Sequence, residues 1–398
     1  MFHVKHAPAN SDLSAPPVTG FGLYVHWPFC AAKCPYCDFN SYVSADVNQE
    51  RWAKAFELEI ERIGRSTRGR TLDSVFFGGG TPSLMNPATA SRILEAARKQ
   101  WRFRNSIEIT LEANPSSVEL ARFVDFAGAG INRVSLGVQA LNDGALRRLG
   151  RLHSTKMARK AWDIANSVFE RASFDLIYAR QHQSLADWSA ELREAVQMSP
   201  SHLSLYQLTI EDGTAFGDLY SKDRLRGLPD ENLGADLYER TQDTCERWGL
   251  PAYEISNHAI PGQESVHNNL YWSAGDYVGI GPGAHGRLTL DGHRIATEQE
   301  RAPAGWLARA LKGDSAIDSR AALTQREQAT EYLVMGMRTA DGVDLKRLNR
   351  MISLSAIFPR SQHLEDLGLV WRSERRMGAT RAGRPLLNQV LKALLPDN

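Results

Sequence analysis

The chain has 398 residues, of which 42% are hydrophobic and 23% are charged, and 47 Lys and Arg side chains almost balance 46 Asp and Glu. This composition is that of a globular protein and excludes a fibrous or intrinsically disordered chain. The net charge of +1 does not indicate a nucleic-acid partner, and no apolar run of about 18 residues predicts a membrane-spanning helix.

The N-terminal segment 1–20 is rich in Pro, Ala and Ser and lacks the apolar core of a secretory signal, so we expect a disordered tail. Of the 4 cysteines, three fall between Cys30 and Cys37, which does not suit a disulfide framework in a chain of this length. We therefore expect a cytoplasmic protein, with peripheral association at a membrane left open.

Short β-branched or aromatic runs then alternate with longer amphipathic stretches. The strands are predicted at 21–27, 72–77, 107–113, 132–138, 173–178 and 202–210. The helices between them are predicted at 47–64, 87–100, 116–128, 154–170 and 184–198. Strand–helix units in this order predict a parallel sheet with right-handed crossovers.

Unusual residues follow several of these strands, as in "FGGGTP", "EANP" and "GVQALN". Functional residues at the carboxyl ends of successive strands are typical of barrel enzymes. An open doubly wound sheet would have the same alternation of strands and helices. We therefore expect an α/β fold with a partial (β/α)6 TIM-like barrel over residues 21–300.

A further helix is predicted at 231–248, and a separate unit is expected over 301–398. Thr324 looks like a helix N-cap, and two further short helices follow, the second of which is closed by Gly368. A strand pair and a helix come after them. This order predicts a small winged-helix-like α+β domain. Residues 320–384 hold 12 Lys and Arg against 7 Asp and Glu, a surplus that could face solvent, an anionic small ligand or DNA, with solvent favoured.

The cysteines Cys30, Cys34 and Cys37 follow the pattern C-x3-C-x2-C. A structural zinc site usually has four ligands in two separated pairs, and a disulfide would leave one thiol over. Three thiolates on a four-iron cube leave one iron open to a small molecule. An iron–sulfur cluster is therefore favoured over zinc or over buried structural cysteines.

Together, "YVHWPFCAAKCPYCDF", "FFGGGTPSLM", "LEANP", "RVSLGVQALN" and "FDLIY" resemble the radical S-adenosylmethionine superfamily. The branch they are similar to contains oxygen-independent coproporphyrinogen III oxidase and related heme chaperones, and the likeness runs from Tyr24 to His285. It implies a [4Fe-4S] cluster on Cys30, Cys34 and Cys37. It also implies that S-adenosyl-L-methionine binds the open iron. One electron from the cluster then cleaves the S-adenosyl-L-methionine and releases a 5′-deoxyadenosyl radical.

The resemblance also implies roles for other residues in this sequence. Contacts to the bound S-adenosylmethionine are implied for Tyr24, Gly79, Gly80, Thr81, Glu112 and His285. A second S-adenosylmethionine, or the substrate, is implied near Gln139, Arg151 and Asp175. The segment 179–184 departs from the family pattern G-L-P-x-Q, which puts the second site in doubt.

Two histidines are further candidates. His26 lies two residues after Tyr24, on the same strand face, and could act catalytically as a proton donor, although a packing role is an alternative. His267 lies in "HNNLYW", a signature of the heme-chaperone group, and a neutral imidazole there could bind heme iron. Cys245 reads as a buried helix residue without a role.

Phe39 stands where the oxidase branch carries a further cysteine, and together with "HNNLYW" it favours a heme chaperone. We expect such a chaperone to bind heme and deliver it to an apo-protein, for example a respiratory one, and to need an electron donor for the cluster. The alternative is an oxidase that decarboxylates coproporphyrinogen propionates to vinyl groups in porphyrin biosynthesis. Enzymatic activity therefore stays open, and a DNA-binding regulator is the least favoured function.

Overall fold

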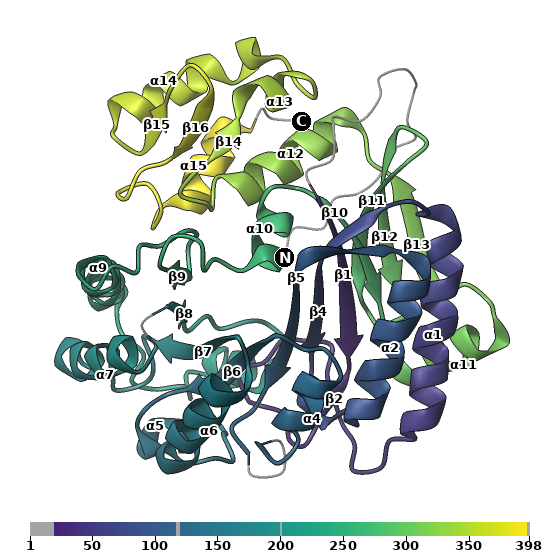
Figure 1. Cartoon of the computed structure of the whole chain (residues 1–398). Coiled ribbons are helices and arrows are strands. Elements are labelled where there is room, and N and C mark those ends of the chain that lie inside the picture. The colour runs from purple at the N-terminus through teal and green to yellow at the C-terminus, as the bar shows by residue number, and fades with distance from the viewer. Residues whose placement is uncertain (1–19, 117–119, 200, 396–398) are drawn as a thin grey trace.

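The computed structural model describes residues 20–116, 120–199 and 201–395. An 11-stranded sheet runs through it in the order β13-β12-β11-β10-β1-β4-β5-β6-β7-β8-β9 (Figure 1). Its parallel strands are β10 (Asp276–Ile280), β1 (Phe21–Trp27), β4 (Thr71–Gly79), β5 (Arg102–Ala113), β6 (Arg133–Gln139), β7 (Arg171–Tyr178) and β8 (His202–Gln207). Antiparallel strands extend both edges, namely β9 (Asn257–Ala259), β11 (His285–Leu290), β12 (His293–Gln299) and β13 (Ile317–Ala322).

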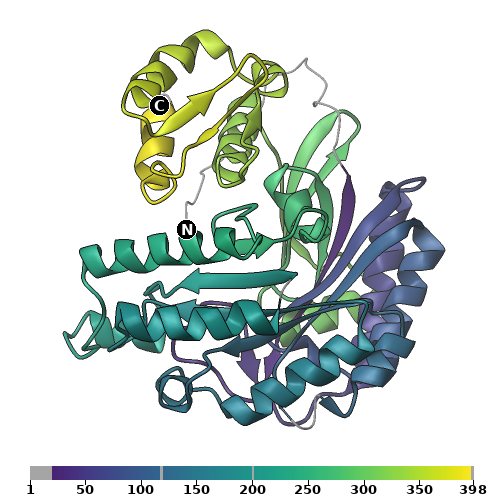
Figure 2. The same cartoon turned by 60° about the vertical axis from the view of Figure 1, so that its left-hand side comes forward.

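Helices cover the outer face of this curved sheet (Figure 2). They are α1 (Gln49–Ser66), α2 (Pro87–Gln100), α4 (Phe123–Gly128), α5 (Asp143–Arg148), α6 (Thr155–Val168), α7 (Leu185–Met198), α9 (Glu231–Arg247) and α11 (Pro303–Lys312). Helix α8 (Ala215–Tyr220) instead lies against the segment that carries the three cysteines, and α10 (Val266–Trp272) lies at the end of the barrel where the parallel strands begin. The six predicted strand–helix units and the partial barrel are confirmed. The helix expected at 116–128 is described from residue 120, with α4 beginning at Phe123, and residues 117–119 lie outside the described ones, as do residues 1–19 of the expected tail.

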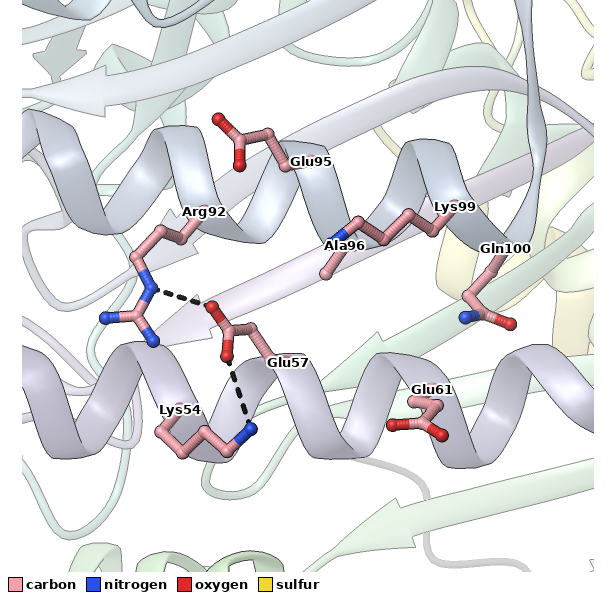
Figure 3. A pocket seen from close by; sticks show the side chains of 8 residues that line it. All are labelled: Lys54, Glu57, Glu61, Arg92, Glu95, Ala96, Lys99 and Gln100. Atoms are coloured by element: carbon pink, nitrogen blue, oxygen red, sulfur yellow. Dashed lines mark hydrogen bonds and ion pairs between the residues drawn. The ribbon is translucent and has the colours of Figure 1, made fainter.

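The two faces of each central strand have different surroundings. On β1, Leu23, Val25 and Trp27 are fully buried beneath the outer helices, whereas Tyr24 pairs in register with Phe76 and faces the barrel interior. The outer helices carry charged side chains on their free surface. Figure 3 shows a shallow groove between α1 and α2 where Glu57 pairs with Arg92 (2.7 Å) and Lys54 (3.8 Å).

The second unit has its own hydrophobic core. It consists of α12 (Gln325–Gly336), β14 (Val343–Asp344), α13 (Leu345–Asn349), α14 (Phe358–Asp366), β15 (Val370–Arg372), β16 (Arg376–Ala379) and α15 (Leu387–Leu394). Its sheet order is β14-β16-β15. Thr324 caps α12 in a capping box with Glu327, and Gly368 has a positive φ of 69°, as their sequence positions predict.

The boundary between the units lies later than the expected position at residue 301. Strand β13 pairs with β12 in the large sheet, and Trp306 of α11 is fully buried and stacks on Trp52 of α1 at 5.4 Å. Residues 301–322 therefore belong to the barrel unit, and the second unit begins near Leu323.

The second unit lies at the end of the barrel where the parallel strands begin (Figure 1). Arg347 of α13 donates to the Ala274 carbonyl at 2.9 Å, next to the end of α10. Arg381 pairs with Glu239, Asp243 and Glu246 along α9. No described helix is long and apolar enough to cross a membrane.

Candidate functional site

The cysteine-rich loop lies at the opposite end, where the parallel strands finish. It leaves β1 and begins with β2 (Phe29–Cys30), which pairs in parallel with β3 (Tyr42–Val43). The Cys37 amide donates to the Cys34 carbonyl at 3.1 Å, which forms a tight turn between the second and third thiols. Cys30, Cys34 and Cys37 are all free of disulfides, and burial raises the pKa of the Cys30 and Cys37 thiols.

The surroundings of these thiols fit an iron–sulfur cluster. Thr81 Oγ1 donates to Cys30 Sγ at 3.5 Å, and Arg151 Nη1 donates to Cys34 Sγ at 3.3 Å, as suits thiolate ligands. Among the described residues, no three His, Cys, Asp or Glu side chains are close enough together to hold a single metal ion. Three thiols on one loop, two of them beside hydrogen-bond donors, suit the cysteine ligands of an iron–sulfur cluster.

The glycine turn at the end of β4 lies against this loop. The Gly80 amide donates to the Trp27 carbonyl at 2.7 Å, and the Thr81 amide donates to the Phe29 carbonyl at 2.9 Å. Gly79 has a φ of 109°, and a Cβ atom on Gly80 would lie 2.8 Å from the Phe29 carbonyl oxygen. Glycine is therefore required here for the turn to reach the cysteine loop.

Two acids face the barrel interior beside the turn. Glu112 at the end of β5 accepts a hydrogen bond from the Gly79 amide at 3.2 Å, and burial, with a smaller contribution from Asp175, raises its pKa to about 8. Asp175 on β7 accepts from Ser135 Oγ at 3.1 Å, and burial raises its pKa to about 6. Such buried acids can accept hydrogen bonds from the hydroxyl groups of a ligand.

Gln139 and Arg151 lie at the same edge, at the end of β6 and beyond α5. Gln139 adopts a φ of 69°, which is strained for a residue other than glycine, and its buried Oε1 has no partner in the described structure. Arg151 also donates to the Gly137 carbonyl at 2.7 Å and to Asn114. The guanidinium therefore ties the cysteine loop to the ends of β5 and β6.

His26 has a different environment from that of a proton donor facing substrate. Its Nε2 lies 2.9 Å from the Asn40 carbonyl oxygen and its Nδ1 lies 3.0 Å from the Tyr24 hydroxyl, while burial lowers its pKa. Asn40 in turn donates to the Pro282 carbonyl at 2.9 Å. The arrangement supports the packing alternative, because both ring nitrogens are engaged within the protein.

His285 begins β11 at the same edge, and its ring is exposed. Burial of part of the ring lowers its pKa, against an opposing effect of Glu298, whose Oε1 lies 3.9 Å from Nε2. His285 also contributes to the lowered pKa of His26, and its contact with a bound nucleoside stays a prediction.

His267 lies at the other end of the barrel, on α10, and is 1% exposed. Its Nδ1 lies 2.8 Å from Ser74 Oγ, its Nε2 lies 2.7 Å from the Tyr271 hydroxyl, and its ring stacks on Phe76 at 4.9 Å. Burial lowers its pKa to about 3. The structure therefore does not bring His267 to the cluster site. It also does not offer His267 as a heme ligand, because binding heme iron would require one of these hydrogen bonds to break.

The atypical segment 179–184 is held by an ion pair. Ala179 and His182 adopt φ values of 56° and 60°, and the buried Arg180 pairs with the buried Glu191 of α7. Glu191 also accepts from the Leu141 amide at 2.6 Å. This pair fixes the loop beside Gln139 without the glycine and proline of the family pattern.

Sequence reasoning missed Asn40 and Asn114. Asn114 donates to Thr81 Oγ1 at 3.1 Å, and Asn40 holds the end of the cysteine loop against Pro282 and Arg301. The available signals were the strand-end asparagine in "LEANP" and the glycines of "GPGAHG". Only the fold shows that Asn114 contacts Thr81 and that Asn40 contacts Pro282 within "GPGAHG".

Comparisons with known proteins agree with this geometry. The family described as "Radical SAM superfamily" matches residues 24–194, and the "HemN C-terminal domain" matches residues 323–386. The heme chaperone HemW of Haemophilus influenzae is 38% identical over 96% of this chain and 100% of its own length. HemW of Escherichia coli is 39% identical over 72% of this chain and 75% of its own length.

A mitochondrial protein of Bos taurus, radical S-adenosyl methionine domain-containing protein 1, is 35% identical over 94% of this chain and 87% of its own. Among solved structures, the coproporphyrinogen III oxidase HemN of Escherichia coli matches with a TM-score of 0.79, covering 94% of this chain and 90% of its own at 22% identity. At that identity, the likeness concerns the fold.

Proposed function

The chain belongs to the radical S-adenosylmethionine superfamily, on the branch of HemN and HemW, and from this membership we propose that it is a heme chaperone that binds heme and delivers it to heme-accepting proteins. The observation that carries the proposal is the correspondence with HemW over nearly the whole chain, including the cysteine loop. Phe39, two residues after the third cysteine, agrees with it because the oxidase branch has a cysteine there; its side chain is 55% exposed.

The family carries a [4Fe-4S] cluster with S-adenosylmethionine, which when bound supplies one-electron chemistry at the open iron. We propose that Cys30, Cys34 and Cys37 hold the cluster. The backbone of Gly79 and Gly80 would then lie against the bound nucleoside methionine, as the resemblance implies, and glycine at both positions lets the turn pack against His26 and Phe29. The Glu112 carboxyl group, beside Gly79 at the end of β5, would accept hydrogen bonds from ribose hydroxyls.

The remaining residues position this set. Arg151 holds Cys34 and the end of β6, and His26 holds Asn40 at the exit of the cysteine loop. We propose a respiratory apo-protein as the heme recipient and a separate protein as the electron donor of the cluster. Both proposals rest on the chaperone function and not on a surface of this chain.

An anaerobic experiment tests the proposal. Reconstituted protein is titrated with hemin, mixed with an apo-cytochrome, and separately incubated with coproporphyrinogen III, S-adenosylmethionine and a reductant. We expect stoichiometric hemin binding and transfer to the apo-cytochrome. Sustained formation of protoporphyrinogen would instead identify an oxidase.

A further inference from the structure

The end of helix α5 brings one arginine, Arg151, to the cysteine loop. After α5, Gly150 adopts a φ of 68°, and its amide donates to the Arg147 carbonyl at 3.1 Å. The Arg151 amide donates to the Leu146 carbonyl at 2.9 Å. These two hydrogen bonds form the Schellman motif that commonly ends a helix at a glycine. The local sequence "LRRLGR" therefore fixes the backbone position of Arg151.

Gly150 also lets this turn approach the cysteine loop closely. A Cβ atom on Gly150 would lie 2.6 Å from Pro35 Cδ, so a larger residue would push the turn and the loop apart. Pro35 directly follows Cys34, and the Pro35 carbonyl accepts from the Phe216 amide of α8 at 2.8 Å. The α5 turn and α8 thus both hold the chain next to Cys34.

The Arg151 guanidinium is directed at the Cys34 sulfur. Its Nη1 donates to Cys34 Sγ at 3.3 Å, while Nη2 donates to the Gly137 carbonyl at 2.7 Å and to Asn114 Oδ1. Within the part of the chain that the structure describes, no Asp or Glu forms an ion pair with Arg151. The anionic group that this cation faces is therefore the Cys34 thiolate.

Asp175 is an acid at the same edge of the barrel, but it is engaged elsewhere. It accepts a hydrogen bond from Ser135 Oγ at 3.1 Å. Burial raises the pKa of Asp175 to about 6, and Arg151 makes only a small opposing contribution. The positive charge of Arg151 thus acts chiefly on the thiolate.

A positive charge beside a ligand sulfur favours one oxidation state of an iron–sulfur cluster. A cluster that takes up one electron from a reductant gains one negative charge, and no bond to the protein forms or breaks in this step. A nearby cation stabilises the more negative, reduced state. Hydrogen bonds to the sulfurs are among the features that set the reduction potential of such clusters.

We infer that Arg151 raises the reduction potential of the cluster through its hydrogen bond to Cys34. The inference rests on the proposed function only for the cluster itself, and it makes Arg151 a positioning residue that acts through a ligand. The hydrogen bond from Thr81 to Cys30 is longer, at 3.5 Å, and its donor is neutral, so its effect is smaller. With Arg151 in place, a one-electron donor protein of less negative potential can reduce the cluster.

An anaerobic redox titration with dithionite, followed by electron paramagnetic resonance, measures this effect. It compares the full chain with Arg151→Gln, Arg151→Lys and the control Arg148→Gln, which changes an exposed arginine in the last turn of α5. We expect Arg151→Gln to lower the ratio of reduced to oxidised cluster at a given potential by about 10–100-fold. At about 59 mV per tenfold for one electron, the midpoint then falls by about 60–120 mV. Arg151→Lys keeps the charge and should fall less, and Arg148→Gln should not change because solvent screens its charge.

A second variant tests the charge without removal of the guanidinium. Asn114→Asp gives Arg151 a carboxylate partner in place of the amide oxygen that it now contacts. We expect the midpoint of Asn114→Asp to fall as well. Iron and sulfide analysis reports how much cluster each variant holds, and circular dichroism checks that each is folded.

The outcomes separate this inference from the proposed function. An unchanged midpoint in Arg151→Gln overturns the inference even if less cluster is bound, because Arg151 would then only hold the loop. Where Arg151→Gln binds no cluster, an unchanged midpoint in Asn114→Asp overturns it. A full chain that holds a cluster but binds no hemin overturns the chaperone function alone, and a full chain without iron and sulfide after reconstitution overturns both.

Discussion

The Tyr24 hydroxyl donates a hydrogen bond to His26 Nδ1 across 3.0 Å. The direction follows from the other ring nitrogen, because Nε2 lies 2.9 Å from the Asn40 carbonyl oxygen, which can only accept, so Nε2 must carry the proton. The relay Tyr24–His26–Asn40 thus joins an interior residue of β1 to the exit of the cysteine loop, and it fixes a neutral imidazole in one tautomer.

Replacement of His26 should loosen the cysteine loop. We expect His26→Phe to lower the iron and sulfide bound per chain after anaerobic reconstitution by several fold, because Asn40 loses its donor and Tyr24 its acceptor. Chemical iron and sulfide analysis and electron paramagnetic resonance of the reduced protein measure the effect. His293→Gln, on the exposed β11–β12 turn, is the matched control, and full cluster content in His26→Phe would contradict the positioning role.

The raised pKa of Glu112 predicts a pH dependence of stability. In the unfolded chain this group ionises near pH 4.5, and in the folded chain only near pH 8, so the folded state binds more protons between these values. Stability should therefore fall as pH rises from about 4.5 to 8, by at most about 1.4 kcal/mol per pH unit from this group.

Urea unfolding of the ligand-free protein and of Glu112→Gln at several pH values isolates this contribution. The difference between the two proteins removes the histidine contributions, which they share. We expect the free energy of unfolding of Glu112→Gln to increase relative to that of the parent protein as pH rises from about 4.5 to 8. Parallel stability curves for the two proteins would show that Glu112 ionises normally.

His267 is expected to stabilise the barrel end and not to ligate heme iron. His267→Gln removes the stacking on Phe76 and disturbs the hydrogen bonds to Ser74 and Tyr271, so the free energy of unfolding should fall by roughly 2–4 kcal/mol. The Soret position of bound hemin should be unchanged. A shifted Soret band in the folded variant would restore His267 as a ligand.

The buried Arg180–Glu191 pair should show strong coupling. We expect Arg180→Met to cost about 3–5 kcal/mol, because Glu191 is left buried without its counter-charge. The double variant Arg180→Met/Glu191→Leu should recover much of that loss, although the Leu141 amide loses its acceptor. A double-mutant cycle by urea unfolding measures the coupling, and additive losses would mean that the pair does not hold the 179–184 loop.

The sequence predicted six of the seven parallel strands because they are buried on both faces and so appear as continuous apolar runs, as in β1, but it did not predict β10. It did not predict β13, whose residues are mostly exposed at a sheet edge and whose partner β12 can be found only in three dimensions. The domain boundary was misplaced for this reason.

The candidate site, like the fold, could be predicted from the sequence only in part. The cysteines and the glycine turn could be identified because their spacing is local, and the fold brings them together as expected. The position of His267 could not, because its contact with Ser74 joins residues 193 positions apart. Its spacing of four from Tyr271 on a helix was the one local sign of a structural role.

The stacking of Trp306 on Trp52 determines where the chain can be divided for study. A fragment ending at residue 300 would uncover the Trp52 ring and leave β12 as a bare edge, which invites self-association. A fragment ending near Leu323 would keep α11 and β13 in place. The later cut is therefore the one from which an isolated barrel could be purified.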